Sequence, residues 1–398
     1  MAQVKLSMYY APFWDGLREH HTQMWSEQYI PCDSAQELPD AETPDGQCAA
    51  DILYSHAKLL HARVIRNPAP IRLRNVFVAG LVHSAGTMRP QSVSSSCWAL
   101  GREGIAFGKA RRSMMQAVGR VAAVLDSQQV ANVLWGYATC QEPLPHCALL
   151  IQRLVSIHHG DGIDRVYPKT VSKVLHSYGQ LYHRNKADTL TETTQVELLE
   201  VVSKVATGFS AHDVAHTVAG LGKLRLGQNQ AAEHMRAAVD RACHSMTHQH
   251  VAMTLHGFAQ FRQDLGDSAA GLMAHLVSLD EAEANVTVQS LVQALGAFAQ
   301  LNMRVHAAAL SSECRNRWIE CIAKHAHKFP VDKLVLCVAA LGKMKWDFGV
   351  ALQPLQLAVS DAPRISRKEL HVLRSGFSQS MQPLGLAARV LFQPESNP

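Results

Sequence analysis

The sequence predicts an all-α protein, an α-solenoid of about eight stacked helical hairpins with a period of about 40 residues. Three observations predict this fold. An apolar stripe recurs at helical spacing, small residues recur beside it, and a second helical stretch follows each stripe. The chain has 398 residues, of which 47% are hydrophobic. It is therefore long enough, and apolar enough, for such an array to bury a continuous core.

The stripe is defined by one apolar residue in each segment, which we call the anchor. The anchors lie 36 to 43 residues apart, at Leu100, Tyr137, Tyr178, Leu221, Phe258, Phe298, Leu341 and Phe377. Seven positions earlier stand Val93, Val130, Val171, Val214, Val251, Leu291, Leu334 and Leu370. Three positions earlier stand Cys97, Leu134, Leu175, Val218, Leu255, Leu295, Val338 and Arg374, so only the last copy is polar there. Residues at this spacing share one face of an α-helix and cannot share one face of a strand.

Small residues flank every anchor. Ala99, Gly136, Ser177, Gly220, Gly257, Ala297, Ala340 and Gly376 precede the anchors, and Gly101, Ala138, Gly179, Gly222, Ala259, Ala299, Gly342 and Ser378 follow them. Glycine inside a helix costs up to ~1 kcal/mol relative to alanine. Its recurrence at one register therefore predicts a close approach of the neighbouring helix.

Second helical stretches lie between these segments. They are expected over 109–125, 147–158, 193–206, 231–246, 269–278, 307–328 and 348–360. Each pair of helices would form one hairpin, and stacking of hairpins would bury the apolar faces.

The chain divides into four predicted regions: an irregular, partly disordered N-terminal extension (1–48), a helical N-terminal cap (49–90), the helical-repeat array (91–392) and a C-terminal tail (393–398). Residues 31–47 are acidic and contain several prolines, which is typical of a flexible segment. Helices in the cap are expected over 51–64 and 74–83.

Charge and cysteine content exclude several classes of protein. The 38 Lys and Arg residues exceed the 33 Asp and Glu residues by five, a basic excess that permits a polyanionic partner without requiring one. No apolar run approaches the ~20 residues of a membrane span, so no membrane association is expected. Nine cysteines occur without a secretory signal pattern, which favours reduced thiols over disulfides.

Three of the predicted helices have sequences that are more specific than general amphipathicity requires. They read Val-Ala-Asn-Val-Leu-Trp-Gly-Tyr-Ala-Thr (130–139), Val-Ala-His-Thr-Val-Ala-Gly-Leu-Gly-Lys (214–223) and Leu-Val-Gln-Ala-Leu-Gly-Ala-Phe-Ala-Gln (291–300). They resemble the first helix of the octotricopeptide and heptatricopeptide repeats, which are related to the helical part of FAST-kinase-like proteins. No RAP-like segment accompanies the resemblance. Those families bind RNA in organelles, so the resemblance implies a mitochondrial protein, or alternatively a plastid one, that binds a transcript or the rRNA of the organellar ribosome.

A second line of residues runs beside the core stripe, at positions five and two before each anchor and two after it. We call this set the candidate face. Its members are Ser95, Trp98 and Arg102; Asn132, Trp135 and Thr139; Lys173, His176 and Gln180; His216, Ala219 and Lys223; Met253, His256 and Gln260; Gln293, Gly296 and Gln300; Leu336, Ala339 and Lys343; and Val372, Ser375 and Gln379. Amides and cations can donate to bases or phosphates, and Trp and His rings can stack on unpaired bases.

Further cations lie four or six residues after five successive anchors, at Arg184, Arg225, Arg262, Arg304 and Lys345. They are expected near one edge of the array, as phosphate ligands whose affinity falls as the salt concentration rises. The predicted RNA-binding residues are therefore these five and the polar members Arg102, Asn132, Trp135, Lys173, His176, Gln180, His216, Lys223, His256, Gln260, Gln293, Gln300 and Lys343. The structural alternative is that cations in a last helical turn complement the helix dipole.

No metal site, cofactor or catalytic site is expected. The best metal-type cluster is Cys314, Cys321, His325 and His327, for which packing in the core is favoured over structural zinc. Asp280, Glu281 and Glu283 lie at a polar boundary between helices, where solvation or capping is expected. Phosphate-loop, nucleophile-elbow and zinc-protease motifs are all missing from the sequence, so an enzyme is not expected.

Two functions stay open at this point. The first is a non-catalytic RNA-binding protein, with single-stranded RNA or rRNA segments, and ribosomal or other ribonucleoprotein components, as partners. The second is a protein-binding scaffold like HEAT and armadillo arrays, which have similar periods. The apolar members of the candidate face, Met253, Leu336 and Val372, favour the second.

Overall fold

The computed structural model describes residues 46–160, 165–226, 229–263, 265–282, 286–305, 310–362 and 365–380. Most of the expected N-terminal extension, residues 381–392 of the expected array and the expected C-terminal tail lie outside these ranges. Apart from one isolated bridge between Leu144 and Ala187, the regular elements in the described ranges are helices. None of these helices combines the length and the apolar content that a membrane span requires.

The α-helices follow one another along the chain as α2 (Gly46–His61), α3 (Ile71–Ser84), α4 (Pro90–Glu103), α5 (Arg111–Val121), α6 (Ser127–Cys140), α7 (Cys147–His159), α8 (Pro168–His183), α9 (Glu192–Val205), α10 (Ala211–Leu224), α11 (Asn229–Ala242), α12 (His248–Phe261), α13 (Asp267–Glu281), α14 (Val288–Val305), α15 (Ser312–His325), α16 (Val331–Met344), α17 (Leu352–Ser360) and α18 (Arg367–Gln379). Short 3₁₀ helices extend several of them, at Gly108–Ala110, Ala122–Val124, Ala206–Gly208, Cys243–Ser245, Ala326–Lys328 and Gly349–Ala351.

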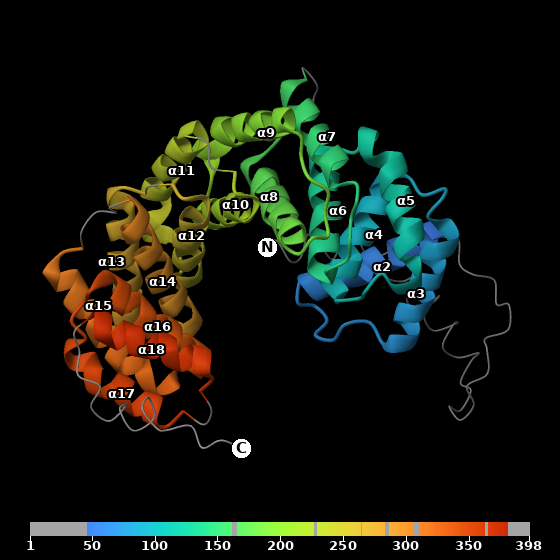
Figure 1. The fold of residues 1–398 in the computed structure, drawn as a ribbon. Helices are drawn as coiled ribbons and strands as arrows, with labels where there is room; N and C mark the ends of the chain where they lie inside the picture. Colours follow the sequence, from blue (N-terminus) through green and yellow to red (C-terminus); the bar gives the residue numbers. More distant parts are fainter. Residues whose placement is uncertain are drawn as a thin grey trace, which may run out of the picture. The chain divides into compact units, whose positions relative to one another are not determined.

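The helices form two rows (Figure 1). Each even-numbered helix from α2 to α18 packs against the next even-numbered helix, and we call these helices the even row. The odd-numbered helices, together with their 3₁₀ extensions, pack in series in the same way and form the odd row. The protein is therefore all-α with neighbouring hairpins packed in series, as predicted for an α-solenoid.

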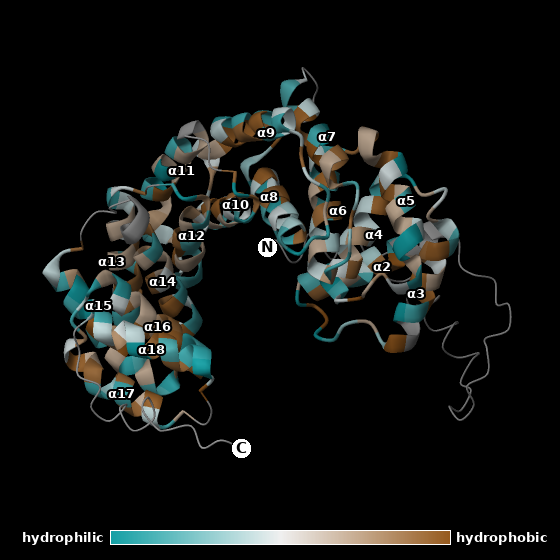
Figure 2. Cartoon of the chain, in the orientation of Figure 1, coloured by the Kyte–Doolittle hydropathy of each residue, from teal (hydrophilic) through white to brown (hydrophobic). Residues whose placement is uncertain are grey.

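The predicted stripe forms the core of the even row. All eight anchors are at most 2% exposed, and the residues seven positions earlier are buried except Leu370, which is half-buried. Of the residues three positions before the anchors, only Arg374 is exposed, as its polarity predicts. Each helix carries hydrophilic as well as hydrophobic residues (Figure 2), so the amphipathic pattern alone directs one face inward.

The close approach predicted from the glycines is confirmed within the even row. A Cβ atom added to Gly220 of α10 would lie 2.5 Å from the carbonyl oxygen of Leu175 in α8, and one added to Gly257 of α12 would lie 2.5 Å from that of Val218 in α10. Gly296 of α14 differs, because nothing lies within 4 Å of its added Cβ. The backbones of α8, α10 and α12 therefore touch where only glycine fits.

The expected N-terminal cap is built like the hairpins that follow it. Its first helix, α2, begins at Gly46, earlier than predicted, and packs against α4 in the even row. Its second helix, α3, packs against α5 and the 3₁₀ helix Gly108–Ala110. Leu53 and Ala57 of α2 are fully buried and have the spacing of the core stripe. The array of packed hairpins therefore starts before residue 91, where the repeat pattern becomes clear in the sequence.

Capping residues mark where the even-row helices begin and end. Asp126, Ser210 and Thr247 form capping boxes at the starts of α6, α10 and α12. Five of these helices end four residues after the anchor, at a residue with left-handed backbone conformation. These residues are Gly104, Gln141, Arg225, Arg262 and Lys345, with φ between 53° and 64°.

Candidate nucleic-acid interface

The predicted RNA-binding residues of the even-row helices lie at the surface of that row and outside its core. Arg102, Asn132, Trp135, Lys173, His176, Gln180, His216, Lys223, His256, Gln260, Gln293 and Gln300 are half-buried, and Lys343 is exposed. This graded burial is expected for residues beside a core stripe, because helical periodicity turns them partly toward solvent. It leaves one edge of each side chain available to a ligand.

Aromatic rings and lysines meet across the first four helices of the even row. The rings of Trp98 in α4 and Trp135 in α6 lie 6.3 Å apart at 31°. Lys173 of α8 places its ammonium 5.2 Å from the Trp135 ring, where the ring quadrupole attracts a cation. Lys58 of α2 lies over Trp98 in the same way, at 5.9 Å. Lys173 also donates to Asn132 Oδ1 at 2.9 Å, so three predicted residues come together here.

Two histidine–glutamine pairs repeat along the candidate face. The amide nitrogen of Gln180 lies 2.6 Å from Nε2 of His176 on α8, and that of Gln260 lies 2.9 Å from Nε2 of His256 on α12. Because an amide nitrogen only donates, each imidazole accepts at Nε2 and carries its proton on Nδ1. Each pair therefore presents a neutral ring and a fixed set of donors and acceptors.

A stack of histidine rings connects α8, α10 and α12. The ring of His216 lies 4.1 Å from that of His176 and 3.9 Å from that of His212, and His212 contacts His250 edge-on at 5.7 Å. Burial and neighbouring bases lower the pKa of His216 to about 3 and that of His176 to about 4. These rings are therefore neutral at pH 7, so they offer planes for stacking.

Several polar atoms on the candidate face are enclosed by protein and have no hydrogen-bond partner. Within the described ranges these are Nε of Arg102, Nδ1 of His176 and Oε1 of Gln260. Outside the candidate face, the hydroxyl oxygens of four residues are also enclosed and unpaired, at Ser96, Tyr137, Ser177 and Thr217. Buried polar groups are nearly always paired in folded proteins, and each unpaired one costs about 1–3 kcal/mol. Each of the three face residues therefore carries one enclosed polar atom that is left unpaired.

The five cations after the anchors do not occupy one equivalent position. Arg225, Arg262 and Lys345 do, since each is the exposed left-handed residue that ends its helix. Arg184 follows α8 with φ of −95°, and Arg304 lies within α14, where its side chain falls outside the described part. Three of the five cations therefore share one backbone position at the end of their helices, and Arg184 and Arg304 do not. Burial lowers the pKa of Lys223, and the nearby Arg184 lowers it further.

The five central helices of the even row are nearly free of acidic residues. Asp213 is the only Asp or Glu in the sequences of α6, α8, α10, α12 and α14, and it is buried, where it accepts from Ser172 at 2.8 Å. The charged groups that shift the pKa values of His61, His176, His216 and His256 are all bases. Within the described residues, no predicted cation of the interface forms an ion pair.

Many cations of the odd row are engaged in structure instead. Several pair with acids, as Arg111 does with Glu142 at 2.6 Å and Lys204 with Glu200 at 3.0 Å. Others donate to carbonyl groups of the preceding hairpin, as Arg153 does to Leu125 at 2.8 Å. Positive charge without acidic partners is thus found on the five central helices of the even row, an arrangement that a polyanion would favour.

Sequence reasoning missed part of this surface. Tyr54, Lys58 and His61 of α2 join it, since Tyr54 and His61 contact the Trp98 ring at 5.5 and 5.9 Å. His212 was also missed, because it lies nine positions before its anchor and outside the three positions considered. The core spacing of Leu53 and Ala57 is the signal that could have placed α2 in the same row.

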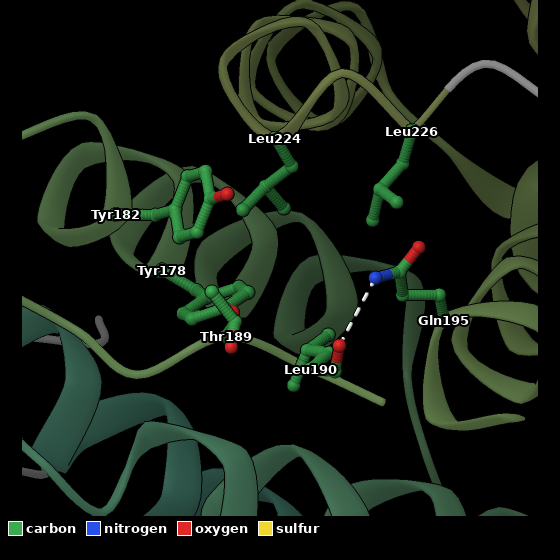
Figure 3. Close-up of a pocket in the computed structure, with 7 residues that line it drawn as sticks. All are labelled: Tyr178, Tyr182, Thr189, Leu190, Gln195, Leu224 and Leu226. Carbon is green, nitrogen blue, oxygen red and sulfur yellow. Dashed lines mark hydrogen bonds between the residues drawn. The ribbon is translucent and has the colours of Figure 1, made fainter. Parts of the chain in front are cut away.

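One small pocket lies away from the candidate face, where α8, α9 and α10 meet (Figure 3). Its lining residues are Tyr178, Tyr182, Thr189, Leu190, Gln195, Leu224 and Leu226. Gln195 donates across it to the carbonyl oxygen of Leu190 at 3.1 Å, and the Tyr178 hydroxyl donates to the carbonyl of Asp188 at 2.9 Å. This lining offers hydroxyls and an amide, without the paired acid and base that hydrolytic catalysis uses.

The chain matches no family model, and no curated protein is significantly similar to it.

Stability is expected to fall as the pH is lowered from about 6.5 toward 4. His176 and His216 bind a proton in the unfolded chain near pH 6.5 but resist it when folded, so the unfolded state binds more protons in this window and stability rises with pH. By pH 5, each ring should lower the free energy of unfolding by on the order of 1 kcal/mol relative to pH 7.5. Melting temperatures measured between pH 7.5 and 4.5 should drop less steeply for H176N/H216N than for the exposed-site control H234N. Equal slopes for both variants would contradict this assignment.

Proposed function

We propose that the protein is an α-solenoid of about eight hairpins that binds single-stranded RNA along the even row and catalyses no reaction. Unpaired bases would stack on the rings of Trp98, Trp135 and the histidines, and the amides of Gln180 and Gln260 would contact base edges. Phosphates would lie against Lys223, Arg225 and Arg262. The resemblance of three helices to octotricopeptide and heptatricopeptide repeats supports an RNA ligand in a mitochondrion or plastid, either a transcript or an rRNA.

One observation carries this proposal. On the even row, Lys58 and Lys173 have no acidic partner among the described residues and lie beside the Trp98 and Trp135 rings. Odd-row cations such as Arg111, Lys204 and Arg153 are instead paired or hydrogen-bonded. Like charges in proximity cost free energy unless an anion joins them. A single strand of RNA supplies the two chemistries that this surface lacks, a row of anionic phosphates and unpaired planar bases.

Charge reversal on the two rows tests the proposal. R225E/R262E is expected to weaken the binding of a labelled single-stranded RNA strongly, and to reduce the slope of log K against log salt by about 0.7 for each phosphate ligand removed. R112E/R315E is the matched control, because it changes the net charge equally at exposed residues of α5 and α15. Fluorescence anisotropy measures binding, and circular dichroism should show equal helicity in both variants. Equal weakening by both pairs would indicate unspecific attraction and contradict the proposal.

A protein-binding scaffold is the second candidate, and one observation favours it. Leu336, on the candidate face of α16, is 52% exposed, and Val372 of α18 lies half-buried on the same face. Apolar residues of this kind suit a protein partner better than a phosphate backbone. If R225E/R262E retains full RNA affinity and L336E abolishes capture of a protein partner, this second function replaces the first.

A further inference from the structure

Three metal-ligating side chains meet where α13 packs against α15, outside the candidate face. Asp280 is the penultimate residue of α13, and Cys321 and His325 lie one turn apart on α15. Their ligand atoms all lie within 4.8 Å of one another, and all three residues are buried. Nε2 of His325 is 2.7 Å from Oδ1 of Asp280. One carboxylate, one thiol and one imidazole thus converge from two helices.

The sequence predicted a different set of partners. Cys321 and His325 were expected to share a helical face with Cys314, and Asp280 was expected at a solvated boundary. Asp280 is instead only 6% exposed, and it replaces Cys314 as the third member of the cluster. Helical spacing could identify the pair on α15, but the residue that α13 brings to it depends on how the two helices pack.

We infer that Asp280, Cys321 and His325 bind one divalent ion of the zinc class. Sulfur, nitrogen and oxygen donors in one small site are the set that tetrahedral Zn²⁺ accepts, whereas Mg²⁺ and Ca²⁺ prefer oxygen donors alone. Three protein ligands leave the fourth position of the tetrahedron to a water molecule. The ion would join α13 to α15 and so connect two consecutive hairpins of the odd row.

A neighbouring lysine supports this assignment. Lys324 donates to Oδ2 of Asp280 at 3.1 Å, which leaves Oδ1 directed at His325 and the cluster. Hydrogen bonds to the free atoms of ligating groups fix the orientation of a metal site. The side chain of Lys324 is 55% exposed, so it also marks the side on which the cluster lies nearest to solvent.

Binding requires a defined movement of protons. The ion would bind the thiolate of Cys321, and the thiol proton would leave to solvent. In the metal-free protein Nε2–H of His325 donates to Oδ1 of Asp280. Binding would require this proton to leave Nε2, with the neutral imidazole then protonated on Nδ1, so that the Nε2 lone pair and Oδ1 both become free for the ion. Affinity for the ion should therefore rise with pH.

Cobalt titration of the untagged, reduced, metal-stripped full chain tests the inference. One Co²⁺ per chain should bind, with a thiolate-to-cobalt charge-transfer band and the visible d–d bands of tetrahedral coordination. Zn²⁺ should displace it at about micromolar concentration or below. The charge-transfer band should disappear in C321S and persist in C314S, a matched control on the same helix whose thiol is outside the cluster.

A second measurement does not depend on the spectrum. Zn²⁺ should raise the melting temperature of the wild type and of C314S, and should leave those of C321S and H325Q unchanged. The two variants can be compared with the metal-free wild type to show that they fold. The inference is overturned if Co²⁺ gives no charge-transfer band, or if the band persists in C321S. It is equally overturned if Zn²⁺ stabilises all four proteins alike.

Discussion

Replacing Gly136 with alanine is expected to destabilise the protein by ~3 kcal/mol, through the contact between α4 and α6. The added Cβ would lie 2.5 Å from the carbonyl carbon of Cys97, and closer still to its oxygen. Both atoms belong to the backbone of the neighbouring helix, so no side chain can rotate away and the helices must separate. Overpacking that forces backbone shifts typically costs about 1–3 kcal/mol, and occasionally more.

Gly296 provides the matched control. It lies inside α14, in the register of the candidate face, and nothing lies within 4 Å of its added Cβ. G296A should therefore stabilise the protein by up to ~1 kcal/mol, the difference in helix propensity. Chemical denaturation measures both variants, and hydrogen exchange in α4 and α6 locates the damage in G136A. A G136A protein that unfolds like the wild type would show that the close approach carries no energetic weight.

Replacing Arg225, Arg262 and Lys345 with glycine is expected to weaken RNA binding by at least ~tenfold while it raises stability. All three residues hold left-handed backbone conformations, with φ of 56°, 57° and 53°, which cost a residue with a Cβ about 1 kcal/mol relative to glycine. Glycine already occupies the equivalent position after α4, at Gly104. Removing three phosphate ligands should reduce the slope of log K against log salt by ~2.

The opposite signs of the two effects make this test specific. Loss of binding through unfolding would lower stability, whereas this triple variant should melt at a higher temperature than the wild type. Gln141 is the control, because it has the same conformation without the charge. Q141G should gain stability and keep full affinity for RNA. Unchanged RNA binding in the triple variant would mean that these cations serve the helix ends alone, as expected from the helix dipole.

The apolar periodicity of the sequence was sufficient to predict which segments form helices and which residues form the core. Residues at positions minus seven, minus three and zero must share a helical face whatever the helix packs against, because 3.6 residues complete one turn. The anchors are therefore buried as predicted. For the same reason the candidate face was assigned before any contact was known. The cap was predicted to be helical. Only two residues of α2, Leu53 and Ala57, have the spacing of the core stripe, which was too few to reveal that α2 belongs to the even row.

What the sequence by itself determined is therefore the all-α class, the succession of hairpins, and the residues that share a face of each helix. Only the tertiary structure decided which residues from different helices meet. It stacked His176 on His216, set Lys173 over Trp135, and moved Asp280 from an expected solvated boundary to Cys321 and His325. The physical reason is that periodicity fixes directions within one helix, whereas contacts between residues about 40 positions apart depend on how successive helices pack together.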